Sequence, residues 1–188
     1  MRDSINSRRE AVLRDLLSNK KGLVVHCSAL TANGKAFAFA GLADIGKTTL
    51  AEKLGKKMEV INDDMNIFEF TDKGINVSTY FTQSENRGFH YIINEKAGGI
   101  LKTVLFPVKE YSLDSFLEPL TDKAFIWTAL LTCTAPPLKG EDHLFPAYLE
   151  LIDRLIDSVP FFKVHHNLKD PPEFLAELLK TVQKKSVD

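Results

Sequence analysis

Hydrophobic and polar positions follow two different periods along this chain, one typical of helices and one typical of strands. Apolar side chains recur at helical spacing over 4–18, 144–159 and 170–182. Shorter apolar runs bounded by turn residues predict strands over 23–31, 35–40, 58–62, 65–70, 75–81, 89–94, 100–106 and 161–165. Further helices are expected over 47–57, 112–118 and 121–132. Because the two kinds of element are interspersed, the pattern predicts an α/β fold.

Two turn signals predict that the sheet is mixed and contains β-hairpins. Asn33 and Gly34 separate the first two strands, and both residue types tolerate a positive φ. Residues 71–74 separate a second pair of strands. A tight turn forces antiparallel pairing, whereas parallel strands need a longer crossover. We expect an N-terminal helix within 1–22 and a single domain over 23–188.

Residues 41–48 carry the pattern G-x-x-x-x-G-K-T between an apolar strand and a helical run. In that context the pattern predicts a phosphate-binding P-loop, because backbone N–H groups form a concave nest and the helix start adds further donors. Lys47 would supply a point charge to the phosphates and Thr48 a hydroxyl for magnesium. The residues expected to bind the nucleotide are Gly41, Ala43, Asp44, Ile45, Gly46, Lys47, Thr48 and Thr49.

Asp44 stands where such loops often carry glycine. Aspartate tolerates left-handed backbone geometry better than most residues, so the loop can still form. Its charge beside phosphates would be unfavourable unless the side chain points outward, and this could lower the affinity for a nucleotide.

Composition narrows the choice of partners. The chain has 188 residues, of which 44% are hydrophobic and 26% charged, and its formal net charge is −1. This near-neutral balance does not favour a nucleic-acid-binding surface. No apolar run approaches the roughly 18 residues of a membrane span, and the N-terminus has no apolar signal region. Cys27 and Cys133 lack metal-ligand spacing and suit a reducing compartment, so we expect a cytoplasmic protein.

An acidic pair follows the strand that comes after the predicted P-loop helix. Asp63 and Asp64 would lie at the end of strand 58–62, where α/β sheets bind ligands. A carboxylate near the transferred phosphate can accept a hydroxyl proton or hold magnesium. The alternative is a solvated pair in a turn. His26 could contact phosphate or move protons, although a strand histidine is more often structural.

Together these residues resemble the kinase core of the HPr kinase/phosphorylase family. Val159-Pro160-Phe161-Phe162 between two helices is similar to the tail of that family, and 85–88 partly matches its Glu-x-Arg-Gly signature. The resemblance implies a single P-loop domain like the family's C-terminal domain, distantly akin in fold to phosphoenolpyruvate carboxykinase. It also implies ATP and Mg²⁺ as cofactors. The roles it implies are phosphate binding by Lys47, catalysis near the phosphates by His26, a base from Asp63 or Asp64, and metal binding by Thr48, Asp63 and Glu85.

Three functions remain open at this stage. The first is a kinase that transfers the γ-phosphoryl group of ATP·Mg to a hydroxyl of a protein, a peptide or a small molecule, with a homo-oligomer as one open form. The second is a nucleotide-binding accessory or regulatory protein with little or no turnover, which Asp44 and the partial signature favour. The third is a small-metabolite kinase of ordinary P-loop topology, against which the Asn33-Gly34 hairpin argues.

Overall fold

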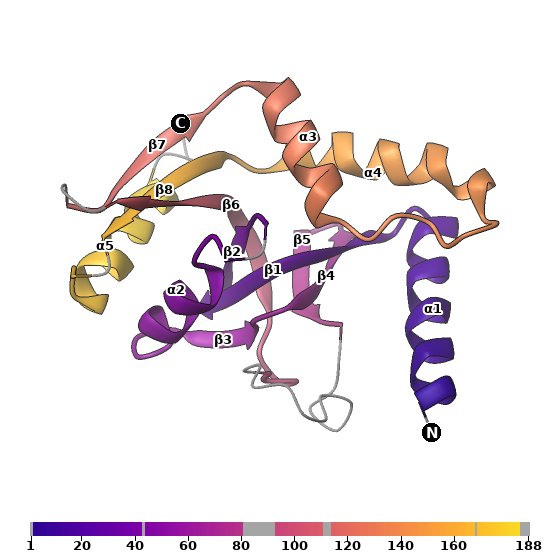
Figure 1. Cartoon of the computed structure of the whole chain (residues 1–188), viewed down its shortest axis with the longest axis horizontal. Helices are drawn as coiled ribbons and strands as arrows, with labels where there is room; N and C mark the ends of the chain where they lie inside the picture. Colours follow the sequence, from indigo (N-terminus) through magenta and orange to yellow (C-terminus); the bar gives the residue numbers. More distant parts are fainter. Residues whose placement is uncertain (1, 43, 81–92, 111–113, 168, 185–188) are drawn as a thin grey trace.

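Helices cover both faces of a central sheet in the computed structural model, which describes residues 2–42, 44–80, 93–110, 114–167 and 169–184. The helices α1 (Arg2–Ser18), α3 (Lys123–Cys133) and α4 (Phe145–Ser158) pack on one face. The helices α2 (Lys47–Leu54) and α5 (Pro172–Lys184) pack on the other and appear together at the left of Figure 1. The predicted α/β class is confirmed.

The sheet is mixed, and the strand pairings within it close into a ring. Its strands are β1 (Gly22–Ala32), β2 (Lys35–Ala40), β3 (Glu59–Asn62), β4 (Met65–Thr71), β5 (Gly74–Thr79), β6 (Gly99–Glu110), β7 (Phe116–Leu120) and β8 (Phe161–Asn167). They run in the order β2-β1-β4-β5-β6-β8-β7, β3 also pairs with β1, and β2 also pairs with β6. Only β2–β6 and β6–β8 are parallel among the described pairings. The sheet therefore differs from the mainly parallel sheet of ordinary P-loop kinases.

The first predicted hairpin is confirmed in detail. Asn33 and Gly34 have φ values of 51° and 71°, so the turn that joins β1 to β2 uses two left-handed residues. Strand β2 then places small and large side chains on opposite faces, because successive residues alternate. Ala36 and Ala38 face the side of α1, α3 and α4, whereas Phe37 and Phe39 face α2 and α5.

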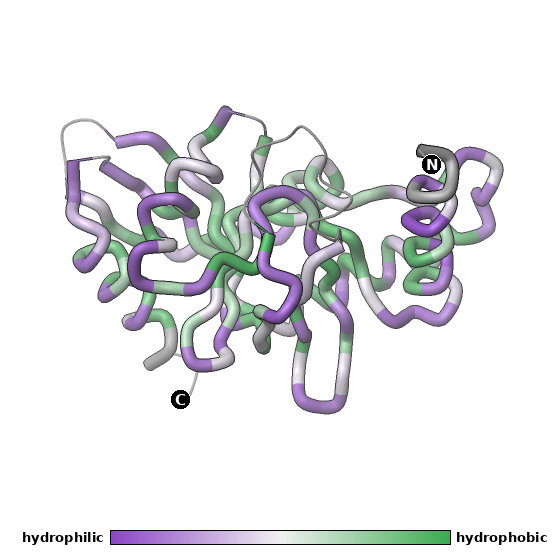
Figure 2. Tube along the Cα trace, turned by 90° about the horizontal axis from the view of Figure 1, so that it is seen from below, coloured by the Kyte–Doolittle hydropathy of each residue, from purple (hydrophilic) through white to green (hydrophobic). Residues whose placement is uncertain are grey.

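Amphipathic helices complete the two cores. The predicted stripe of α4 is buried, with Leu151 and Leu155 fully inaccessible to solvent. In α5 the stripe is confirmed for Leu175, Leu179 and Val182, but Phe174 is 42% exposed. Figure 2 shows the resulting distribution, with hydrophobic segments inside the molecule and polar segments at turns and outer surfaces. No described helix is both long enough and apolar enough to cross a membrane.

The helix predicted over 112–118 is wrong for the part that the structure describes. Residues Phe116–Leu120 instead form β7, which pairs antiparallel with β8 at the edge of the sheet. A segment this short has no decisive period, so pairing with β8 decides its conformation. Pro119 is compatible with this position, because an edge strand tolerates a residue without an N–H donor. Two smaller differences are that α2 ends at Leu54, three residues before the predicted end, and that α3 begins at Lys123, with Asp122 as its N-cap. Most of the strand predicted over 89–94, and the first two residues of the helix predicted over 112–118, lie outside the described residues.

We expect Gly34→Ala to lower the free energy of unfolding by about 1 kcal/mol, because an L-residue is strained at this positive φ. A Cβ at Gly34 meets no atom within 4 Å, so the effect comes from the backbone alone. Thermal unfolding should show a midpoint lower by roughly 2–4 °C. Asn33→Gly is the control, since glycine accepts the φ of 51° there. An unchanged midpoint for Gly34→Ala would contradict the left-handed turn.

Candidate active site

Residues 41–48, which the sequence predicts to bind phosphate and which we call the phosphate loop, connect β2 to α2, and the structure describes all of them except Ala43. Gly41, Asp44 and Gly46 have φ values of 142°, 61° and 110°, so the backbone turns repeatedly through left-handed geometry. The predicted left-handed conformation of Asp44 is confirmed, and its side chain is exposed. Gly46 is the N-cap of α2 and no side chain caps the helix there. The N–H groups of the first helical turn are therefore available to an anion.

Lys47 lies across the phosphate loop. Its side chain is buried, and Nζ donates hydrogen bonds to the carbonyl oxygens of Gly41 (2.9 Å) and Leu42 (2.8 Å). Burial lowers the pKa of Lys47, and the nearby acids Asp63 and Asp64 act in the opposite direction. Because these two carbonyls belong to the loop, the ammonium group already lies close to the place where a phosphate would bind, and it could neutralise phosphate charge there.

The two acids interrupt the strand formed by β3 and β4. Both strands pair antiparallel with β1, and between them Asp63 and Asp64 lie opposite Cys27 and Ser28. The Cys27 N–H donates to the Asp64 carbonyl at 2.8 Å, so the backbone stays attached to β1 at this point. The buried Asn62 side chain accepts from the Asp64 N–H at 3.0 Å and donates to the Met65 carbonyl at 2.7 Å. Such an irregularity redirects side chains out of the strand's alternation.

Asp63 is directed toward the start of α2. It is 4% exposed, and Oδ1 accepts a hydrogen bond from the Ser28 hydroxyl. Burial raises the pKa of Asp63, whereas the hydroxyls of Ser28 and Thr48 lower it by stabilising the charged form. The second oxygen, Oδ2, is buried without a hydrogen bond of normal geometry to any described residue. Asp63 thus has a hydroxyl neighbour and one buried carboxylate oxygen whose missing partner could be a cation.

Asp64 pairs with His26 beside a small pocket. His26 Nε2 lies 3.5 Å from Asp64 Oδ1. Burial raises the pKa of Asp64, and the neighbouring His26 and Arg9 lower it. Burial and the Lys47 charge lower the pKa of His26. The pair opens into a cavity of about 300 Å³, also lined by Met65 and by residues 132–135 at the end of α3. An acceptor group could therefore approach Asp64 from the side opposite α2.

The structure brings together most residues that the sequence nominated. Near one another lie the catalytic and metal candidates Lys47, Thr48, Asp63, Asp64 and His26. Ala43, Glu85 and Arg87 lie outside the described residues. Thr49 is exposed on the first turn of α2. Among the described residues, no group of three or more His, Cys, Asp or Glu side chains is arranged to hold a metal ion.

Three neighbours of the site were missed from the sequence. Ser28 could have been found, because it stands two residues after His26 and a strand places such residues on one face. Arg9 belongs to α1, far away in sequence, and acts on Asp64 through space. His166 belongs to β8 and lies against Gly46. Nothing local in the sequence indicates the last two positions.

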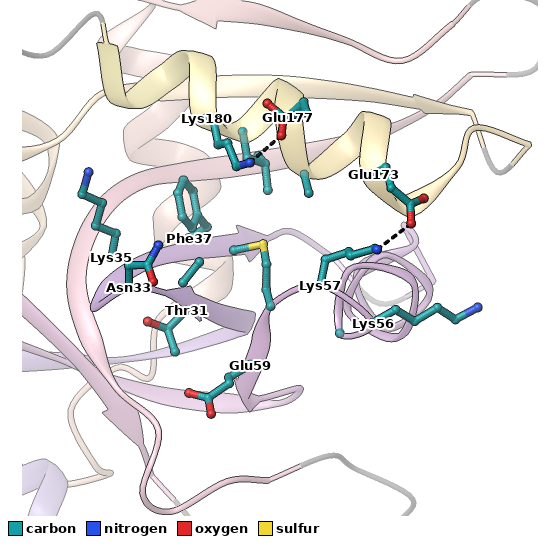
Figure 3. A pocket seen from close by; sticks show the side chains of 15 residues that line it. Thr31, Asn33, Lys35, Phe37, Lys56, Lys57, Glu59, Glu173, Glu177 and Lys180 are labelled. Atoms are coloured by element: carbon teal, nitrogen blue, oxygen red, sulfur yellow. Dashed lines mark hydrogen bonds and ion pairs between the residues drawn. The ribbon is translucent and has the colours of Figure 1, made fainter.

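A larger hollow of about 910 Å³ lies at the other end of α2 and is drawn in Figure 3. Lysines and glutamates from the turn after α2, from β3 and from α5 line it, and Lys57 pairs with Glu173 at 2.7 Å. An eight-residue helix is about 12 Å long, so this hollow lies about that far from the phosphate loop. The acids at 63–64 do not line it. We place the candidate active site at the phosphate loop, where the chemically matched groups converge.

Comparisons with known proteins give a likeness to solved structures alone. No model of a known protein family and no curated protein sequence matches the chain. Among solved structures, the chain is similar to the Hpr(Ser) kinase/phosphatase from Coxiella burnetii, with 14% identity over 88% of this chain and 99% of that chain. The TM-score is 0.49, so the relationship in fold is distant. The proposals below rest on the side chains of the site itself.

We expect Asp64→Asn to raise the thermal midpoint at pH 7. Burial holds the folded-state pKa of Asp64 above its ordinary value, so the folded state binds this proton more tightly than the unfolded state. The free energy of unfolding therefore falls as pH rises from the unfolded pKa through the folded pKa. The gain from Asp64→Asn should be largest above the folded pKa and should vanish near pH 4, about the unfolded pKa of aspartate.

Thermal scans of both proteins across this pH range measure the effect. Asp72→Asn is the matched control, because Asp72 is exposed in the β4–β5 turn. A wild-type protein that is more stable than Asp64→Asn at pH 7 would contradict the assigned environment of Asp64.

Proposed function

We propose that this chain is a magnesium-dependent kinase that transfers the γ-phosphoryl group of ATP to a hydroxyl group. The observation that carries the proposal is the different setting of the two neighbouring acids. Asp63 lies beside Thr48 at the start of α2, whereas Asp64 lies beside His26 and faces a pocket. One acid is thus suited to a metal and the other to an acceptor.

The phosphate loop would bind the polyphosphate of the nucleotide. Its left-handed residues would let backbone N–H groups face a bound phosphate, and the N-terminus of α2 adds the positive end of a helix dipole. Lys47 would exchange its carbonyl partners for phosphate oxygens. Phosphoryl transfer needs little covalent chemistry from the protein, so positioning and charge neutralisation account for most of the catalysis.

Thr48 and Asp63 fit a magnesium ion. The buried Oδ2 of Asp63 has no hydrogen bond of normal geometry to the described residues, and the Thr48 hydroxyl is close enough to affect the same carboxylate. Magnesium usually takes one or two protein oxygens and fills its other positions with phosphate oxygens and water. When bound, the ion would neutralise charge on the transferring phosphate. Glu85, outside the described residues, would be a further ligand by the family resemblance.

Asp64 would act as the general base. Its raised pKa makes the carboxylate a better proton acceptor than an ordinary aspartate. The acceptor hydroxyl would lose its proton to Asp64 as its oxygen forms a bond to the γ-phosphorus. The bond from that phosphorus to the bridging oxygen of ADP breaks, and ADP leaves. His26 would orient Asp64 through the contact at 3.5 Å.

The open pocket beside His26 has room for a small acceptor group next to Asp64. Its volume of about 300 Å³ is at the lower end of ligand pockets. A serine side chain presented by a protein or peptide fits this space, as does a small hydroxyl compound. Thr132 and Cys133 line the wall contributed by α3 and can contact the acceptor there.

The rival function is a nucleotide-binding accessory protein with little turnover. The exposed, left-handed Asp44 favours it, because a carboxylate next to the phosphates lowers the affinity for a nucleotide. Turnover with an acceptor separates the two functions, and so does release of inorganic phosphate from ATP.

Two substitutions test the division of labour within the site. Lys47→Ala should weaken ATP·Mg binding by a factor of about 10 or more, since a charged hydrogen bond is worth about 1.5–3 kcal/mol. Asp64→Asn should leave binding within about threefold but reduce turnover by roughly 10²–10⁴. Calorimetry measures binding, and phosphate release or acceptor labelling measures turnover. Lys56→Ala, an exposed lysine at the far end of α2, is the control. Equal affinity of wild-type protein and Lys47→Ala would reject the proposal.

A third substitution tests the charge at Asp44. We expect Asp44→Asn to tighten ATP·Mg binding by about two- to fivefold, the usual size of an exposed charge interaction. Asparagine tolerates the same positive φ, so the loop conformation is kept. The gain should shrink as salt is added, because salt screens exposed charges. Binding titrations at low and high ionic strength give both values, and an effect independent of salt would argue against a charge mechanism.

A further inference from the structure

His166 is a buried histidine without a hydrogen bond of normal geometry. Its side chain is 1% exposed, and neither Nδ1 nor Nε2 makes such a bond to any described residue. Buried polar groups in folded proteins almost always have a partner. His165, its neighbour in β8, lies on the other face and pairs with Glu118 at 2.9 Å. Of these two adjacent histidines, only His166 therefore lacks a hydrogen bond of normal geometry to a described residue.

The ring of His166 lies directly against the phosphate loop. A Cβ built on Gly46 would stand 3.0 Å from His166 Nε2 and 3.1 Å from Cε1. The edge of the ring that carries Nε2 thus faces the Gly46 backbone. The side chain of Lys109 passes the same point, with its Cε 3.8 Å from that Cβ position. Only glycine leaves room for this contact at position 46.

The topology explains why a residue near the C-terminus reaches the loop. Strand β2 runs parallel to β6, and β6 runs parallel to β8. Lys109 and His166 are partners in the β6–β8 register. The carboxyl ends of these three strands lie at one edge of the sheet, where ligands bind in open α/β folds. The phosphate loop begins at the same edge.

The backbone of Ile45 offers a hydrogen-bond acceptor beside the ring of His166. Burial and the charges of Lys109 and Lys53 lower the pKa of His166, whereas the Ile45 backbone raises it. Of the two backbone groups of Ile45, the carbonyl is the one that would favour a protonated ring, and the ring already lies against the adjoining Gly46, so we assign the Ile45 carbonyl to the side of His166. A trans peptide points its C=O and N–H in opposite directions. When the Ile45 carbonyl is held toward His166, the Gly46 N–H of the same peptide points away from the ring.

We infer that His166 is a positioning residue of the phosphate loop, whose ring N–H donates to the Ile45 carbonyl and thereby directs the Gly46 N–H toward a bound phosphate. The ring nitrogens of His166 make no hydrogen bond of normal geometry to a described residue. We expect a bound phosphate to attract the Gly46 N–H and thereby to bring the Ile45 carbonyl, on the other side of the same peptide, into hydrogen-bond distance of the ring. The inference rests on the proposed function, because it assigns His166 a role in the same nucleotide site.

Substitutions that separate the hydrogen bond from the volume of the ring test the inference. His166→Phe keeps a planar ring but has no donor, and should weaken binding of both ATP·Mg and tripolyphosphate·Mg by about tenfold. His166→Gln places an N–H donor near the position of Nε2 and should bind both within about threefold of wild type. If the ring only filled space, the order would be reversed, with Phe tolerated and Gln impaired. His165→Phe, on the opposite face of β8, is the matched control.

A measurement on the wild-type chain avoids dependence on how the variants fold. The ring nitrogens of His166 can be followed by nitrogen-15 NMR while tripolyphosphate·Mg is added. One ring N–H should become hydrogen bonded, with a downfield proton signal protected from exchange. An unchanged ring signal in the saturated protein would overturn the inference.

The outcomes also separate this inference from the proposed function. If wild type binds ATP·Mg, Lys47→Ala does not, and His166→Phe binds like wild type, only the role of His166 fails. If wild type binds neither probe, the proposed function and the inference fail together. Loss of binding in His166→Phe with retention in His166→Gln supports the inference.

Discussion

The hydrogen bonding of a single strand, β1, determines the geometry of the candidate site. One edge of β1 pairs with β2, which leads into the phosphate loop, and the other edge pairs with β3 and β4 around the acidic pair. His26 and Ser28 come from β1 itself. Adjacent strands are about 4.8 Å apart, so these ladders bring the loop, the acids and their partners within reach of one another. The helices then bury the sheet and keep this register.

The site concentrates charge in a place where charge is unfavourable without a ligand. Lys47 and Asp63 are buried, and Asp64 is largely shielded from water. Burial lowers the pKa of Lys47 and raises the pKa of Asp63 and Asp64, so it favours the neutral form of each group. A bound polyphosphate and its cation would supply the missing opposite charges. Under the proposed function, the protein would give up part of its stability to keep these groups beside the phosphate loop.

Local signals account for what the sequence predicted well. The Asn33-Gly34 turn and the glycines of the phosphate loop require positive φ values, and this requirement can be recognised from residue types alone. Contacts between distant segments could not be recognised in this way. The local pattern of 112–118 predicts a helix. The pairing of Phe116–Leu120 with β8, which makes this part a strand, is a tertiary interaction that the local pattern does not encode. The positions of Arg9 and His166 depend on how α1 and β8 meet the rest of the sheet. The sequence predicts the two acids at the end of a strand. In the structure β3 and β4 pair with β1 on either side of the acids, and this arrangement depends on strand register, which local signals do not give.

The double pairing of β2 has a mechanical consequence. This strand is hydrogen bonded to β1 along one edge and to β6 along the other. Sliding it along its axis would break both ladders at once, so the anchor of the phosphate loop is rigid. Helix α2 is instead attached to the sheet through apolar contacts of Leu50 and Leu54. Apolar contacts are not directional and can adjust by small shear movements. If a ligand binds the loop, we expect the resulting shift to pass through α2 to α5, the helix that packs beside it.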